Sequence, residues 1–179
     1  MHTAPVSMMD MNKQLFLAEL LRSGLKLRGN VIEIGVYQAG SVWFLAHILK
    51  NLGDTRHFYM LDIFETHMMH PNATMVKDEI TGRLAFYPQT TLLEGLCDAP
   101  RLLEQIENER FCFVHYDLGF HPVTLPFIWE RMQPGAPIVL DNYGHIAADP
   151  WAFDDFFAER GAHVIRNPWS EQGVVFKPC

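Results

Sequence analysis

The sequence has 179 residues and a net charge of −7, with 49% hydrophobic and 20% charged residues. This size and composition are typical of one soluble globular domain with a complete hydrophobic core. The acidic balance and the lack of a basic cluster argue against a nucleic-acid partner.

The first third of the chain alternates between helical and extended patterns. Leucines at helical spacing predict an N-terminal helix within residues 1–29, which Asp10 or Asn12 could cap. A short apolar run then predicts a parallel strand buried on both faces. In chain order we expect a helix at residues 10–27, a strand at 31–34, a helix at 41–52 and a strand at 57–63.

Residues 64–88 are the least regular part of the sequence. They contain two prolines and the stretch HMMH, in which His67 and His70 are candidates for substrate contact. We interpret this region as a lid over a binding site, with a short helix near residues 76–84.

The rest of the chain continues the alternation of strands and helices. This order predicts an α/β fold, a Rossmann-like doubly wound and mostly parallel sheet in three α/β/α layers. No repeat or linker divides the chain, so we expect a single domain over residues 1–179. The remaining elements are expected at residues 90–94 (strand), 99–106 (helix), 110–118 (strand), 123–132 (helix), 136–142 (strand), 149–160 (helix), and 163–166 and 173–177 (a closing hairpin).

A glycine-spaced turn follows the first strand, in the stretch VIEIGVYQAGS. Gly35 and Gly40 lie five residues apart, and Glu33 precedes them; the three-glycine dinucleotide fingerprint and the P-loop lysine are both missing. Asp62 ends the next strand, where an acid can accept hydrogen bonds from a ribose diol. Together these residues indicate a nucleoside cofactor without a pyrophosphate, which S-adenosylmethionine fits. In the alternative reading, Glu33 is a buried acid satisfied by nearby backbone amides.

Four ordered segments resemble class I S-adenosylmethionine-dependent methyltransferases. They are VIEIGVYQAGS, YMLDIFE, LLEGLCDAPRLLEQI and VHYDLGFHPVTLPFIWERMQPGAPIVLDNYG, within residues 30–160. The last segment is similar to the metal-dependent macrolide-sugar O-methyltransferases of the macrocin/mycinamicin type. The resemblance implies cofactor-binding roles for Glu33, Gly35, Tyr37, Gly40, Ser41, Asp62, Ile63, Cys97, Asp98 and Asp117.

The same resemblance implies a divalent metal site, with Mg²⁺ as the expected ion. In the family, the positions of Asp117, Asp141 and Asn142 hold the metal, and carboxylate and amide oxygens suit a hard cation. Asn142 stands where family members usually have a second aspartate, which removes one negative charge. In the alternative reading, the two aspartates lie at the wet rim without a ligand.

Two histidines fall close to these aspartates in the sequence. His121 follows Asp117 by four residues and His145 follows Asp141 by four, so either could act as a general base beside Asp117. His115 lies inside a strand and is expected to serve the core.

Three hypotheses of function follow from these residues. The first is an O-methyltransferase for a small hydroxylated molecule, such as a sugar or natural-product intermediate, that uses a divalent metal. The second is a metal-independent N- or C-methyltransferase. The third is a non-catalytic domain that binds S-adenosylmethionine. The resemblance is also compatible with a homo-oligomer.

The cysteines and the start of the chain bear on cellular location. Cys97, Cys112 and Cys179 form neither a CxxC motif nor a zinc pattern, which favours reduced thiols. The first residues lack the features of a secretory signal, and no apolar stretch has the length of a membrane span. We therefore expect a cytoplasmic protein without a membrane partner.

Overall fold

The structure is a computed structural model that describes residues 9–64, 77–145 and 149–179. Its described strands form one seven-stranded sheet in the order β3-β2-β1-β4-β5-β7-β6. β7 runs antiparallel to both of its neighbours, and the other pairs are parallel. The strands are β1 (Asn30–Ile34), β2 (Phe58–Asp62), β3 (Thr90–Glu94), β4 (Phe111–Tyr116), β5 (Pro137–Leu140), β6 (Ile165–Arg166) and β7 (Gly173–Phe176).

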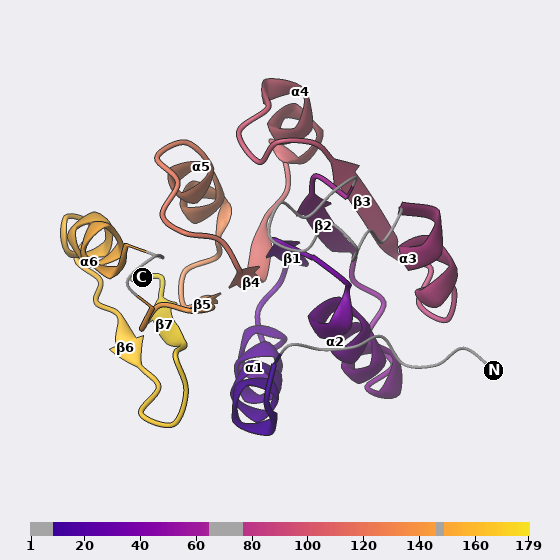
Figure 1. Cartoon of the computed structure of the whole chain (residues 1–179), viewed down its shortest axis with the longest axis horizontal. Coiled ribbons are helices and arrows are strands. Elements are labelled where there is room, and N and C mark those ends of the chain that lie inside the picture. The colour runs from indigo at the N-terminus through magenta and orange to yellow at the C-terminus, as the bar shows by residue number, and fades with distance from the viewer. Residues whose placement is uncertain (1–8, 65–76, 146–148) are drawn as a thin grey trace.

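Helices cover both faces of this sheet, as Figure 1 shows. α1 and α2 lie on one face, α4, α5 and α6 lie on the other, and α3 lies beside the β3 edge. This arrangement confirms the predicted three-layer fold. The helices are α1 (Met11–Gly24), α2 (Gly40–Asn51), α3 (Lys77–Arg83), α4 (Pro100–Leu103), α5 (Thr124–Arg131) and α6 (Pro150–Ala158), with a 3₁₀ turn at Glu104–Ile106 after α4.

The hydrophobic core is divided between the two faces. One cluster joins α1 and α2 to the sheet through side chains such as Leu17 and Val42, and the other joins α4, α5 and α6 through side chains such as Leu125 and Phe153. The central strand β1 has no exposed residue from Val31 to its end, because it contributes to both clusters. The centre of the sheet is therefore buried on both faces up to the point where the predicted site begins.

Local signals explain most of the element boundaries. Asp10 caps α1 by accepting a hydrogen bond from the Lys13 amide at 2.9 Å, as one of the two predicted caps. Pro126 lies in the first turn of α5, where its missing N–H is tolerated. The helix expected at residues 99–106 is instead α4 followed by the 3₁₀ turn.

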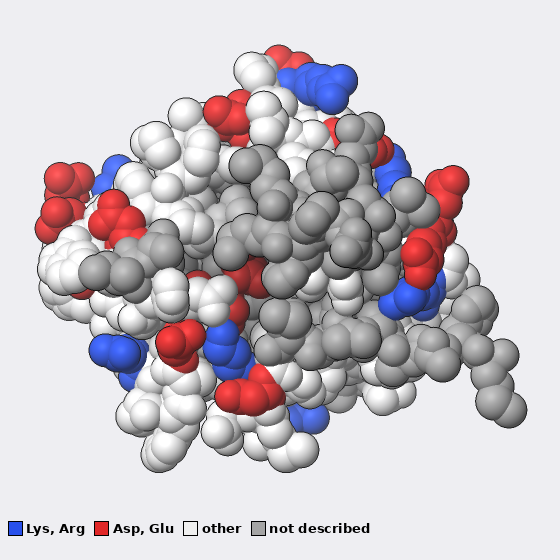
Figure 2. Space-filling model, in the orientation of Figure 1, with Lys and Arg blue, Asp and Glu red and all other residues white. Residues whose placement is uncertain are grey.

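Part of the predicted lid falls outside the described residues. Residues 65–76, which include His67 and His70, are not described, whereas the short helix expected near residues 76–84 is α3. Among the described helices, none has the length and apolar composition needed to cross a bilayer. On the face shown in Figure 2, the described lysine and arginine side chains are scattered among acidic ones.

Candidate functional site

The turn between β1 and α2 lies at the carboxyl rim of the sheet. Three of its residues have positive φ, at 86° for Gly35, 49° for Tyr37 and 60° for Ala39. Left-handed backbone is unfavourable for residues with a Cβ, so neighbouring groups must hold this turn in place.

Asp62 is the main group that holds the turn. Its Oδ2 accepts hydrogen bonds from the backbone N–H groups of Val36 at 2.6 Å and Tyr37 at 2.8 Å, and its Oδ1 accepts one from Ile63 at 2.6 Å. The sequence predicted contact with a ribose for this acid, with a cap at the strand end as the alternative, and these hydrogen bonds show that it binds backbone amides of the protein itself. A carboxylate has about four lone-pair sites, so capacity for a ligand remains.

Gly35 is required for a reason that the sequence did not reveal. A Cβ at this position would collide with the backbone carbonyl of Asp117, which follows β4. The N–H of Asp117 also donates to the Ile34 carbonyl at 2.8 Å, so the chain after β4 passes directly beside the turn. The glycine therefore allows two strand ends to meet, in addition to any approach of a ligand.

Glu33, Ser41 and His115 form a buried polar group beneath the turn. Ser41 donates its hydroxyl hydrogen bond to Oε1 of Glu33, and Nδ1 of His115 lies 3.2 Å from Oε2. Neither side chain of the Glu33–His115 pair has exposed surface, and these two atoms lack hydrogen-bond alignment, so their attraction is mainly electrostatic. Glu33 is thus buried, as in the alternative reading, but its partners are side chains and its Oε2 accepts no hydrogen bond from the described residues.

The charge of His115 follows from its surroundings. Burial by itself lowers the pKa of an imidazole, but the negative charge of Glu33, reinforced by those of Asp117 and Asp141, raises the pKa of His115 to about 9. These carboxylates favour the protonated form of the His115 imidazole, inside the core where the sequence placed it.

The three predicted metal ligands do come together at the rim. Asp117 follows β4 and Asp141 follows β5, and these strands are neighbours. Nδ2 of Asn142 donates to Oδ1 of Asp117 at 3.2 Å, and the backbone of Asn142 has a φ of 57°. Burial, followed by the charge of Asp141, raises the pKa of Asp117 to about 7.

A lysine from a distant part of the chain completes this cluster. Nζ of Lys13 lies 3.0 Å from Oδ2 of Asp141 and 2.9 Å from Oδ1 of Asn142. The other oxygen of Asp141 accepts from Gln172 Nε2 at 2.9 Å. Sequence reasoning missed Lys13, since nothing in its helix sets it apart from an ordinary surface lysine.

The residues present do not fit a resident Mg²⁺. The Asn142 oxygen and one Asp141 oxygen already accept from the Lys13 ammonium, and the Asn142 amide nitrogen faces Asp117. Two of the predicted ligand oxygens therefore converge on the Lys13 nitrogen, and a donor rather than an oxygen of Asn142 faces Asp117, so the three residues do not present the oxygens that octahedral Mg²⁺ requires. Nor does the described part of the chain contain a group of three or more His, Cys, Asp or Glu residues that could hold a metal.

The two histidines proposed as bases have different surroundings. Nδ1 of His121 accepts from the backbone N–H of Thr124 at 3.3 Å, and Nε2 lies 3.9 Å from Asp98. His121 thus caps the start of α5 and faces an acid next to Cys97. His145 is exposed in the segment after β5.

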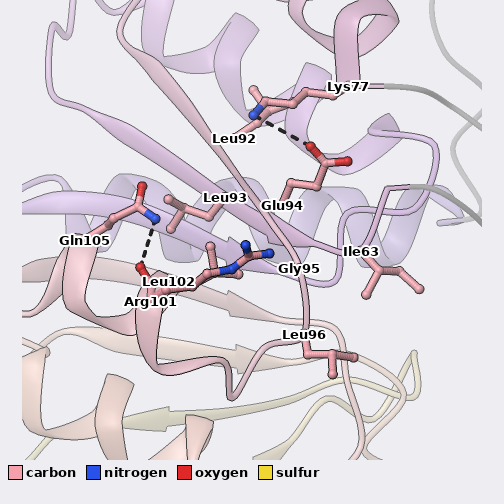
Figure 3. A pocket seen from close by; sticks show the side chains of 10 residues that line it. All are labelled: Ile63, Lys77, Leu92, Leu93, Glu94, Gly95, Leu96, Arg101, Leu102 and Gln105. Atoms are coloured by element: carbon pink, nitrogen blue, oxygen red, sulfur yellow. Dashed lines mark hydrogen bonds and ion pairs between the residues drawn. The ribbon is translucent and has the colours of Figure 1, made fainter.

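A cavity of about 590 Å³ opens beside the edge strand β3 (Figure 3). Ile63 lines it and is the one predicted cofactor residue to do so, while Cys97 and Asp98 follow directly after its wall residue Leu96. Lys77 and Glu94 face each other across 3.8 Å at the same cavity, and Arg101 projects toward Gly95. The cavity therefore continues the rim from the turn toward α4.

Comparisons with known proteins give structural relatives only. No family model matches the chain, and no curated protein matches it significantly. The O-methyltransferase NovP is similar with a TM-score of 0.76 at 16% identity, over 96% of this chain and 81% of that one. The TDP-rhamnose 3′-O-methyltransferase CalS11 of calicheamicin biosynthesis gives 0.75 at 17%, over 93% and 79%. TomG of Streptomyces achromogenes, an O-methyltransferase solved with S-adenosylmethionine, gives 0.68 at 17%, over 96% and 82%.

The chain has the class I methyltransferase fold. Its sheet has β7 antiparallel between β5 and β6, and the similarity to these structures covers 93% of the chain for CalS11 and 96% for NovP. At such low identity the similarity establishes the fold, and the macrocin-type subgroup stays a prediction.

Proposed function

We propose that this protein is an S-adenosylmethionine-dependent methyltransferase that methylates a hydroxyl group of a small molecule. The observation that carries the proposal is the strained turn after β1, which Asp62 holds open at the carboxyl rim. Ligands of doubly wound sheets bind at this rim. TomG, which has the same fold, was solved with this cofactor.

The cofactor is proposed to lie across the turn and the β3 cavity. Backbone groups of the turn face its amino-acid part, Asp62 faces the ribose, and Ile63, Cys97 and Asp98 lie beside the nucleoside. Tyr37, Gly40 and Ser41 belong to the same turn and the start of α2. This placement keeps the predicted cofactor residues at the carboxyl rim, with the exception of Glu33, which is buried beneath the turn.

Methyl transfer then depends on alignment and on removal of a proton. The sulfonium methyl is already electrophilic, so holding an acceptor oxygen in line with it supplies much of the rate increase. Asp117 follows β4 beside the turn, because its backbone contacts Gly35 and Ile34. We assign it the role of accepting the hydroxyl proton; His121 and His145 are the other candidates.

An oxygen acceptor is favoured by the names of the three relatives, which are all O-methyltransferases. The metal-independent reading gains support from Lys13, which occupies the place expected for a cation. A nitrogen or carbon acceptor has no such support, and a metal-independent O-methyltransferase therefore replaces the metal-dependent form of the hypothesis.

Calorimetry with S-adenosylmethionine and S-adenosylhomocysteine tests the cofactor assignment. We expect each of the two compounds to bind at one site per chain. A panel of phenols, sugars and sugar nucleotides is then incubated with the protein and S-adenosylmethionine in the presence of EDTA. We expect mass spectrometry to detect the transfer of one methyl group to members of this panel. Amines in the same panel test the nitrogen alternative. Absence of binding by either cofactor form, in protein that is folded by circular dichroism, would contradict the proposal.

A further inference from the structure

Lys13 reaches the candidate site from the opposite end of the sequence. It lies in the first turn of α1, which packs against β4 and β5, and 128 residues separate it from Asp141. Only 13% of its side chain is exposed, and 5% of that of Asp141. An ammonium group held so far from solvent is costly unless its partners compensate for lost hydration.

The partners of Lys13 are the oxygens that the sequence predicted as metal ligands. Two of its three N–H groups are used by Asp141 and Asn142 in the described part of the chain, which leaves one for a ligand at the rim. A divalent ion would need the same two oxygens at about 2.1 Å, so ion and ammonium cannot share them.

We propose that the Lys13 ammonium takes the place of the divalent cation and supplies the positive charge at this rim. Any role of Lys13 in catalysis rests on the proposed function, whereas its contacts with Asp141 and Asn142 do not. Asn142 fits this reading, because a neutral amide beside Asp141 matches one positive charge better than two. Asp117 accepts from the Asn142 amide, which links the lysine to the carboxylate that follows β4.

The proposal predicts that removal of the lysine charge creates a metal site. Lys13→Met keeps the apolar stem of the side chain and leaves Asp141 and Asn142 without their cation. Adding Asn142→Asp restores the second aspartate usual in the family. We expect Mn²⁺ affinity to rise by at least about tenfold in the Lys13→Met/Asn142→Asp double variant, since the charge and number of ligands set cation affinity.

Binding of Mn²⁺ alone, followed by the electron paramagnetic resonance signal of the free ion, makes the test independent of methyl transfer. The wild type is expected to leave millimolar Mn²⁺ free, and the double variant to bind one ion per chain. Asp141→Asn in the double-variant background should abolish that binding. The control variant Lys26→Met, which changes an exposed lysine just beyond α1, should bind no Mn²⁺.

Two results would overturn the inference. One is Mn²⁺ binding by the wild type that Asp141→Asn removes, because the lysine would then yield to the ion. The other is a folded double variant that gains no binding. If the variant fails to fold, the wild-type measurement still decides. Titration with S-adenosylmethionine on the same samples tests the proposed function separately, so failure of one proposal does not imply failure of the other.

Discussion

Glu33 and His115 face each other across neighbouring strands with no exposed side-chain surface, 3.2 Å apart between Oε2 and Nδ1. This pair lies below the turn after β1, and Ser41 at the start of α2 donates to the same carboxylate. Glu33 therefore connects β4 to the start of α2, and the contribution of the pair to the free energy of unfolding can be measured.

The Glu33–His115 pair predicts a loss of stability at alkaline pH. The pKa of His115 is raised to about 9 against an ordinary 6.5, so the folded protein binds a proton that the unfolded chain releases. The stabilisation is complete below pH 6.5 and is lost as pH rises through 9. Urea unfolding across this range should show a falling free energy, with a slope that His115→Gln reduces and that the exposed control His163→Gln leaves unchanged. A flat wild-type profile would mean that the histidine is neutral.

Asp62→Ala should destabilise the protein even without cofactor. The variant leaves three backbone N–H groups without their acceptor, and each hydrogen bond to a charged group contributes about 1.5–3 kcal/mol. Because the turn relaxes, S-adenosylmethionine binding should weaken as well. Urea unfolding of the cofactor-free protein measures the first effect and calorimetry the second, with Asp155→Ala on the exposed side of α6 as the control. Lost binding at unchanged stability would assign Asp62 to the ligand alone.

Gly35→Ala and Gly53→Ala form a matched pair. Both glycines have positive φ, at 86° and 67°, but a Cβ on Gly53 meets nothing within 4 Å, whereas one on Gly35 collides with the Asp117 carbonyl. We expect a cost of about 1 kcal/mol at Gly53 from backbone strain and clearly more at Gly35, where strands must also separate. Thermal melting of the two variants compares them directly. Equal costs would show that the strand ends can move apart freely.

His121 is expected to act first as a helix cap. Its Nδ1 accepts from the Thr124 amide, so His121→Ala should lower the free energy of unfolding by about 1 kcal/mol. Asn at this position can accept the same hydrogen bond, and His121→Asn should restore most of the loss. Should both variants keep wild-type stability and both lose methyl transfer, the capping role would be wrong and a catalytic role favoured.

The sequence by itself determined the alternation of elements and the position of the rim. Leucine spacing in residues 10–27, the apolar runs of the strands and the turn at Gly35 are local patterns, and each element was found within a few residues of its expected place. The meeting of Asp117 and Asp141 at this rim was implied by the family resemblance, and the pairing of β4 with β5 brings it about.

Only the tertiary structure decided which charges meet at that edge. Lys13 contacts Asp141 because α1 packs across β4 and β5, and His115 contacts Glu33 because of the register between β1 and β4. Such pairs depend on how elements far apart in the chain are packed, so no local spacing encodes them. The same packing placed an ammonium where the sequence had predicted a metal ion.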